Sequence, residues 1–150
     1  MKEKTYLKSE LWKYGISGDL PIITVTVKYI NDLYVVRQIL KAYEYFRTKN
    51  INIDLVIIEE DYIKSEIENT ISNNHMSYLR NIRGGIFVIS RGELKQTDLE
   101  GIKFISEIVL DTHLGNLENT IKDMEDEIID NYKKIETLTI IKKTIGVPVR

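Results

Sequence analysis

A chain of 150 residues with 43% hydrophobic and 29% charged residues has the size and composition of one globular domain, which excludes a disordered or fibrous protein. Its formal net charge of -2, from 21 basic and 23 acidic side chains, gives no electrostatic reason to expect a nucleic-acid partner. Because it contains no cysteine, disulfides, thiolate catalysis and cysteine-ligated metals are excluded.

An entry segment precedes the first predicted strand. From Leu11 to Pro21 it reads Leu-Trp-Lys-Tyr-Gly-Ile-Ser-Gly-Asp-Leu-Pro, and it contains the only tryptophan, Trp12. Gly15 and Gly18 allow backbone angles that other residues resist, which favours a structured turn. We expect Leu11 and Trp12 to anchor the segment on a larger surface.

Four short apolar runs predict β-strands, and amphipathic runs between them predict helices. The predicted strands are 22–29, 53–59, 86–90 and 108–110. The predicted helices begin at Leu33, at about Tyr62, at Thr97 and after Asn116. Strands that alternate with helices pair in parallel through right-handed crossovers. The fold class is therefore α/β, a Rossmann-like three-layer module with a mostly parallel sheet of about four strands and helices on both faces.

Capping side chains predict where the helices start. Asn31 or Asp32 can cap the helix that begins at Leu33, and Thr97 with Glu100 has the spacing of a capping box. For 75–83, an extra helical turn and an irregular connection stay open alternatives. Residues 1–21 are interpreted as the entry segment, 22–135 as a single domain and 136–150 as a linker or edge strand.

Polar residues follow the predicted strands, where ligands of open parallel sheets usually bind. Glu59, Glu60 and Asp61 could supply acid/base carboxylates or ligands for a hard metal ion. The simpler interpretation is that these side chains are exposed and that Asp61 caps the next helix. The candidate contact residues for a ligand or a neighbouring module are Trp12, Asp19, Glu59, Asp61, Arg91, Asp111 and His113.

Common catalytic and cofactor patterns are missing from the sequence. His75 and His113 lie on unrelated connections and lack zinc-motif spacing, and no nucleophile elbow or phosphate-binding glycine fingerprint occurs. We therefore assign no catalytic residue, no metal and no cofactor. The nine tyrosines could stack on sugar rings, but the helical positions of Tyr43 and Tyr132 favour core packing for several of them.

The Gly-Ile-Ser-Gly-Asp-Leu-Pro sequence is followed, in consistent order, by other pieces that resemble the cyclic β-1,2-glucan synthases and related glycoside-phosphorylase-like proteins. These pieces are the apolar run from Pro21 to Val27, Val36-Arg37-Gln38, Asp54-Leu55-Val56-Ile57, Gly84-Gly85-Ile86-Phe87-Val88, Val109-Leu110-Asp111 and Gly115-Asn116-Leu117. The resemblance spans about 11–117. It implies a fragment that lies between a glycosyltransferase part and a phosphorylase-like part, with the catalytic residues, nucleotide-sugar ligands and membrane helices outside it.

The resemblance also implies partners and a location. The leading expectation is a non-catalytic module whose partners are neighbouring modules of a larger protein. Asp19 is expected either to cap or to hold the entry turn. The alternative is a module that binds an oligosaccharide, such as a glucan, or a small phosphorylated ligand at the strand-end loops; an independent hydrolase would rest on the acidic cluster alone. We expect a cytoplasmic segment, without direct membrane insertion, of a parent protein associated with the inner membrane.

Overall fold

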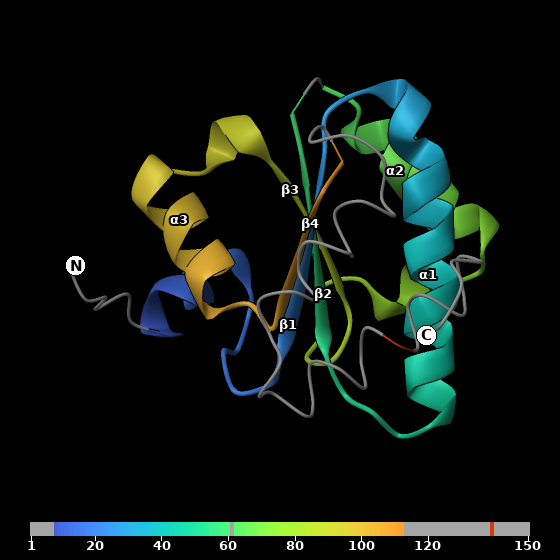
Figure 1. Cartoon of the computed structure of the whole chain (residues 1–150), viewed down its shortest axis with the longest axis horizontal. Helices are drawn as coiled ribbons and strands as arrows, with labels where there is room; N and C mark the ends of the chain where they lie inside the picture. Colours follow the sequence, from blue (N-terminus) through green and yellow to red (C-terminus); the bar gives the residue numbers. More distant parts are fainter. Residues whose placement is uncertain (1–7, 61, 113–138, 140–150) are drawn as a thin grey trace.

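Three layers make up the part of the chain that the computed structural model describes, which is residues 8–60, 62–112 and 139 (Figure 1). The central layer is a sheet of β1 (Ile22–Val27), β2 (Asp54–Glu59), β3 (Ile86–Ser90) and β4 (Ile108–Asp111). Helices α1 (Leu33–Thr48) and α2 (Lys64–Asn73) cover one face. Helix α3 (Gln96–Ile105) and the short helix η1 (Lys8–Tyr14) cover the other.

The four strands are parallel and lie in the order β3-β2-β1-β4. The chain moves from β1 outward to β3 through α1 and α2, and then returns through α3 to place β4 on the other side of β1. A right-handed return crossover has to pass over the opposite face, which explains why α3 lies on the face of the sheet that α1 and α2 do not cover. The predicted three-layer α/β fold is confirmed.

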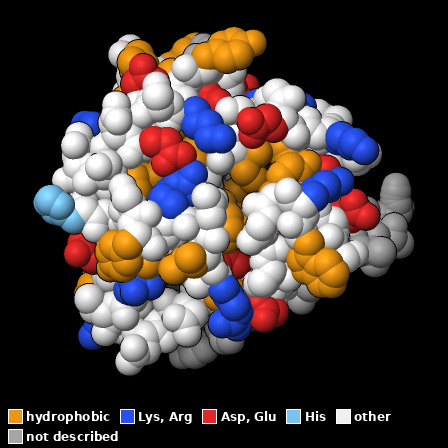
Figure 2. Space-filling model, turned by 180° about the vertical axis from the view of Figure 1, so that it is seen from behind, with side chains coloured by type: hydrophobic (Ala, Val, Ile, Leu, Met, Phe, Trp, Pro, Cys, Tyr) orange, Lys and Arg blue, Asp and Glu red, His pale blue; other side chains and the backbone are white. Residues whose placement is uncertain are grey.

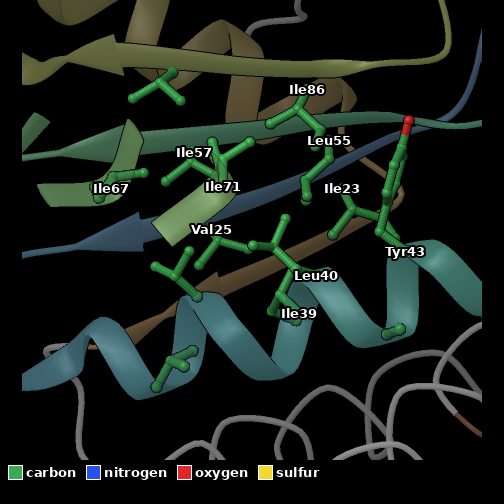
Figure 3. Packing of buried hydrophobic residues seen from close by; sticks show 14 of the residues in the cluster. Ile23, Val25, Ile39, Leu40, Tyr43, Leu55, Ile57, Ile67, Ile71 and Ile86 are labelled. Atoms are coloured by element: carbon green, nitrogen blue, oxygen red, sulfur yellow. The ribbon is translucent and has the colours of Figure 1, made fainter. Parts of the chain in front are cut away.

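Each face of the sheet has its own apolar core because side chains alternate along a strand. On β1, Ile23, Val25 and Val27 pack toward α1 and α2, whereas Ile22 packs toward α3. Each fully buried aliphatic side chain contributes roughly 1.5–3 kcal/mol relative to exposure. Figure 3 labels the core on the α1 and α2 face: Ile23, Val25, Ile39, Leu40, Tyr43, Leu55, Ile57, Ile67, Ile71 and Ile86.

The helix starts differ from the capping predictions. Asp32 occupies the N-cap position of α1, but its side chain makes no capping hydrogen bond. Helix α3 begins at Gln96, so the capping box predicted for Thr97 and Glu100 is wrong: Thr97 already lies in the first turn. A capping box forms instead at Ser90, with Glu93 as its partner, at the start of the short helix η4 (Arg91–Glu93).

Short 3-10 helices also lie in two other connections between the main elements of the described chain. Short helices η2 (Ile30–Asp32) and η3 (Ser77–Leu79) lie before α1 and before β3, so the segment 75–83 is largely irregular with one 3-10 turn. Within the described ranges, no helix is long and apolar enough to cross a membrane. The predicted last helix and nearly all of 136–150 lie outside the described residues.

Candidate functional site

The entry segment is fixed to the α3 face of the sheet by two side chains. Leu11 and Ile16 are fully buried in the core that α3 covers, which confirms Leu11 as an anchor. The expectation that Trp12 is also an anchor is wrong, because its side chain is 66% exposed. Neighbouring residues of a 3-10 helix point about a third of a turn apart, so Leu11 and Trp12 cannot both face the sheet. The indole Nε1 of Trp12 donates to Ser17 O at 3.1 Å, which ties the exposed side chain to the following turn.

The turn after η1 depends on its two glycines and on one carboxylate. Gly15 and Gly18 both have φ of 84°, a conformation that favours glycine. Ser17 Oγ donates to Asp19 at 2.5 Å, and Arg83 Nε donates to both oxygens of Asp19 at 3.0 and 3.2 Å. The bond from Ser17, and then that from Arg83, lowers the pKa of Asp19. Asp19 therefore holds the entry turn against the connection before β3.

An open cavity of about 300 Å³ lies beside this turn, at the amino edge of the sheet. The turn supplies one wall, and the connection from α3 to β4 supplies the other. Its lining residues are Gly18, Asp19, Leu20, Pro21, Ile22, Ile105 and Glu107. The predicted ligand edge is the opposite one, where the strands end, so sequence reasoning missed this cavity. Its only signal in the sequence was the glycine-rich turn.

Polar contacts join η1 to α3. Tyr14 Oη donates to the buried carboxylate of Asp98 at 2.6 Å, and Lys13 Nζ lies 3.1 Å from the same oxygen. Burial, followed by the hydrogen bond to Asp98, raises the pKa of Tyr14 to about 12. Asp98 lies in the first turn of α3, where a negative charge also favours the helix dipole. Sequence reasoning gave no signal for this contact.

Glu59 and Asp111, two of the predicted site residues, point to opposite faces of the sheet. Glu59 is in register with Val27, whereas Asp111 is in register with Thr26, and consecutive residues of β1 face opposite ways. Glu59 is 2% exposed, and its Oε1 accepts from Ile63 N, at the start of α2, at 2.9 Å. Asp111 cannot combine with it in one acid/base pair.

The partners of Asp111 confirm its position on the α3 face. Its carboxylate accepts a hydrogen bond from Thr26 Oγ1 and lies 3.3 Å from Lys103 Nζ of α3. Next to it, Thr112 Oγ1 donates to Thr26 O at 2.9 Å. These contacts fasten β4 to β1 and α3 at the point where the strand order reverses.

The other predicted site residues are Arg91, which has structural partners, and two residues that lie outside the described ranges. Arg91 Nη1 donates to Leu94 O at 3.1 Å, and its Nη2 donates to the side chain of Gln96 at 2.5 Å. Asp61 and His113 lie outside the described residues. In the described part of the chain, no group of three or more His, Cys, Asp or Glu side chains is placed to hold a metal ion.

One buried carboxyl group escaped the sequence reasoning. Asp54 is fully buried at the start of β2; its Oδ1 accepts from Gly84 N at 2.7 Å, and its Oδ2 has no hydrogen-bond partner. Burial raises the pKa of Asp54, an effect that the bond from Gly84 partly offsets. Tyr43 Oη donates to Gly84 O at 2.5 Å. The backbone N–H and C=O of Gly84 are therefore both hydrogen-bonded to side chains, those of Asp54 and Tyr43. An acidic residue within the apolar run 53–59 was the available signal.

Part of the chain is similar to the cyclic beta-(1,2)-glucan synthase NdvB of Rhizobium meliloti (strain 1021), with 42% identity over 53 residues. The similar segment covers 35% of this chain and 2% of that protein. No family model matches the chain. The comparison thus supports, for about a third of the chain, a relationship to part of a cyclic glucan synthase.

Proposed function

We propose that this chain is a non-catalytic module of a protein similar to the cyclic β-1,2-glucan synthases, and that it positions neighbouring modules by binding them at its entry segment. The partial similarity to NdvB supports the family. The observation that carries the docking role is the exposed indole of Trp12, which is tied to Ser17 O on a segment that the fully buried side chains of Leu11 and Ile16 fix to the sheet. Tryptophan is one of the residue types enriched where protein interfaces concentrate their binding energy.

The entry segment is suited to docking because it is already ordered. Leu11 and Ile16 fix it to the sheet, and Asp19 fixes its turn to Arg83. A preordered surface loses less conformational entropy on binding than a flexible one. The face in Figure 2 mixes acidic and basic side chains, which favours a protein partner over a polyanion.

Binding to the neighbouring modules tests the docking role. Purified modules that flank the similar segment in the synthase should bind the chain saturably in a calorimetric titration. Trp12→Ala should weaken this binding by about tenfold or more, as expected for an interface hot spot. Tyr62→Ala is the matched control, since Tyr62 is 96% exposed and lies just before α2, which covers the other face of the sheet. Equal weakening by both variants, or no binding at all, would contradict the proposal.

Turnover tests the non-catalytic character. The described carboxylates Glu59 and Asp111 each have structural partners on opposite faces of the sheet. The purified chain should therefore turn over neither UDP-glucose nor β-1,2-glucan in the presence of phosphate. Turnover by the wild-type chain that a mock purification does not show would overturn this part of the proposal.

A second candidate function is oligosaccharide binding at the carboxyl edge of the sheet. The observation in its favour is that Tyr29, Tyr34 and Tyr62, which follow the adjacent strands β1 and β2, are all exposed. Exposed aromatic rings can pack against the apolar faces of sugars. A phosphorylated ligand has less support, because the guanidinium of Arg91 already binds Leu94 O and Gln96.

Titration with β-1,2-glucans distinguishes this second candidate. It requires saturable heat that Tyr62→Ala reduces and Trp12→Ala leaves unchanged. A flat titration would contradict it while leaving the docking proposal intact. The tyrosines are the appropriate variants because Glu59 and Asp111 have structural partners, so that their replacement would confound binding with stability.

A further inference from the structure

We propose that the cavity at the amino edge of the sheet receives a basic side chain, lysine or arginine, from the docking partner. This inference rests on the proposed docking function and identifies what the partner presents. The cavity is next to the entry turn, it is open to solvent, and its volume of about 300 Å³ is sufficient for one long side chain.

The walls of the cavity are preformed. On one side, the positive φ of Gly18 and the contacts of Asp19 with Ser17 and Arg83 fix the turn. On the other side, Glu107 N donates to Ile22 O at 2.8 Å, which holds the connection from α3 to β4 against β1. A guest side chain therefore enters a cavity whose backbone is already ordered.

The charges around the cavity favour a cation. Asp19 and Glu107 are both among its lining residues, and no basic residue is. Arg83 pairs with Asp19 and offsets one of the two negative charges. The side chain of Glu107 makes no hydrogen bond or ion pair with another described residue, so none of the described residues offsets its negative charge. Helix α3 ends at Ile105, and the C-terminal end of a helix adds a partial negative charge.

The apolar lining suits the stem of a basic side chain. Leu20, Pro21, Ile22 and Ile105 line the cavity together with the two carboxylates. Lysine and arginine commonly lay their methylene groups on apolar surface while the charged end reaches a polar partner. Phosphate or carboxylate ligands would be repelled by Glu107, and a neutral sugar would leave its charge without a counterion.

Nuclear magnetic resonance of the full chain can test the inference with two small probes. The first is arginine blocked as an N-acetyl methylamide, and the second is the equally blocked citrulline, which has nearly the same shape but no charge. The arginine probe should shift the backbone amides of Gly18, Leu20 and Glu107 saturably, and the citrulline probe should not. Equal shifts with both probes, or none with either at millimolar concentration, would overturn the inference.

A pair of variants locates the charge. Glu107→Gln should weaken binding of the arginine probe roughly two- to fivefold, the usual range for a partly exposed ion pair. Glu60→Gln, at the opposite edge of the sheet, should leave it unchanged. Binding should also weaken as salt shortens the Debye length from about 30 Å at 0.01 M to about 8 Å at 0.15 M. Insensitivity to both Glu107→Gln and salt would overturn the assignment of a cation.

The docking partner provides the last test. Glu107→Gln should weaken binding to the flanking modules, as it weakens binding of the probe. The flanking modules could bind Glu107→Gln as tightly as wild type, while Trp12→Ala still weakens their binding. In that case the inference fails and the proposed function stands. If the probe binds the cavity but no module binds the chain, the proposed docking function fails instead.

Discussion

Leu11 and Trp12 are sequence neighbours with opposite environments, one buried and one exposed, and their replacement should destabilise the fold to different extents. Leu11→Ala should lower the free energy of unfolding by about 2–5 kcal/mol, because it leaves a cavity in a fully buried site. Trp12→Ala should lower it by about 1 kcal/mol or less, since it removes one exposed hydrogen bond. Urea unfolding followed by circular dichroism measures both, and a larger loss for Trp12→Ala would contradict the assignment of Leu11 as the anchor.

Asp54 should make stability depend on pH in an unusual direction. Its pKa is raised by burial above the ordinary value of 3.8, so the protonated form is favoured in the folded state. The stabilisation is complete below the unfolded pKa and is lost as pH rises through the folded pKa. As pH rises above about 4, wild type should therefore lose stability relative to Asp54→Asn, which cannot ionise.

Comparison with Asp54→Asn separates the effect of Asp54 from that of carboxyl groups whose pKa values are shifted in the opposite direction. Hydrogen bonds from Ser17 and Arg80 lower the pKa values of Asp19 and Glu68, respectively, so their stabilisation is present above the unfolded pKa and is lost as pH falls. Free energies of unfolding measured as a function of pH should converge for wild type and Asp54→Asn at low pH. Parallel pH profiles for the two proteins would exclude the assigned environment of Asp54.

At the scale of elements, Gly85 controls how closely the connection before β3 packs. A Cβ atom at this position would lie 2.1 Å from Leu79 O and 2.8 Å from Ile82 O, so the backbone of the connection would have to move. Gly85→Ala should cost about 3 kcal/mol or more. Gly92→Ala is the control, because its Cβ would meet no atom within 4 Å, and it should change stability by about 0.5 kcal/mol or less. Thermal unfolding that ranks the two variants equally would contradict the close packing.

The same connection shows why the sequence left 75–83 open. Arg80 binds the carboxylate of Glu68 through two hydrogen bonds, at 2.7 and 2.6 Å, and also donates to Ile86 O at 2.7 Å. These partners lie in α2 and β3, and no local pattern within 75–83 identifies them. The strands and the longer helices were predictable because a hydrophobic period is a local property. Capping was less predictable. Thr97 and Glu100 have the spacing of a capping box, but α3 already begins at Gln96.

At the scale of the whole molecule, the sheet separates the two carboxylates that the sequence grouped together. Glu59 contacts the start of α2 and Asp111 contacts α3, on opposite faces. The losses of stability caused by Glu59→Gln and Asp111→Asn should therefore add within about 0.5 kcal/mol in the double variant, as for independent sites. Urea unfolding of the four proteins of this cycle measures the coupling, and a coupling well above that value would show that the two groups act together.

The sequence by itself determined the α/β class, the four strands and the order of the helices, because alternating and helical periods follow from local geometry. It also identified the entry segment, through its glycines, its proline and Trp12. Only the tertiary structure decided the direction of each side chain: that Leu11 is buried while Trp12 is exposed, and that Glu59 and Asp111 face opposite ways. It also brought Glu107 to the entry turn, because the return of the chain through α3 places β4 beside β1. Contacts between residues so far apart depend on strand order and register, which no local period encodes.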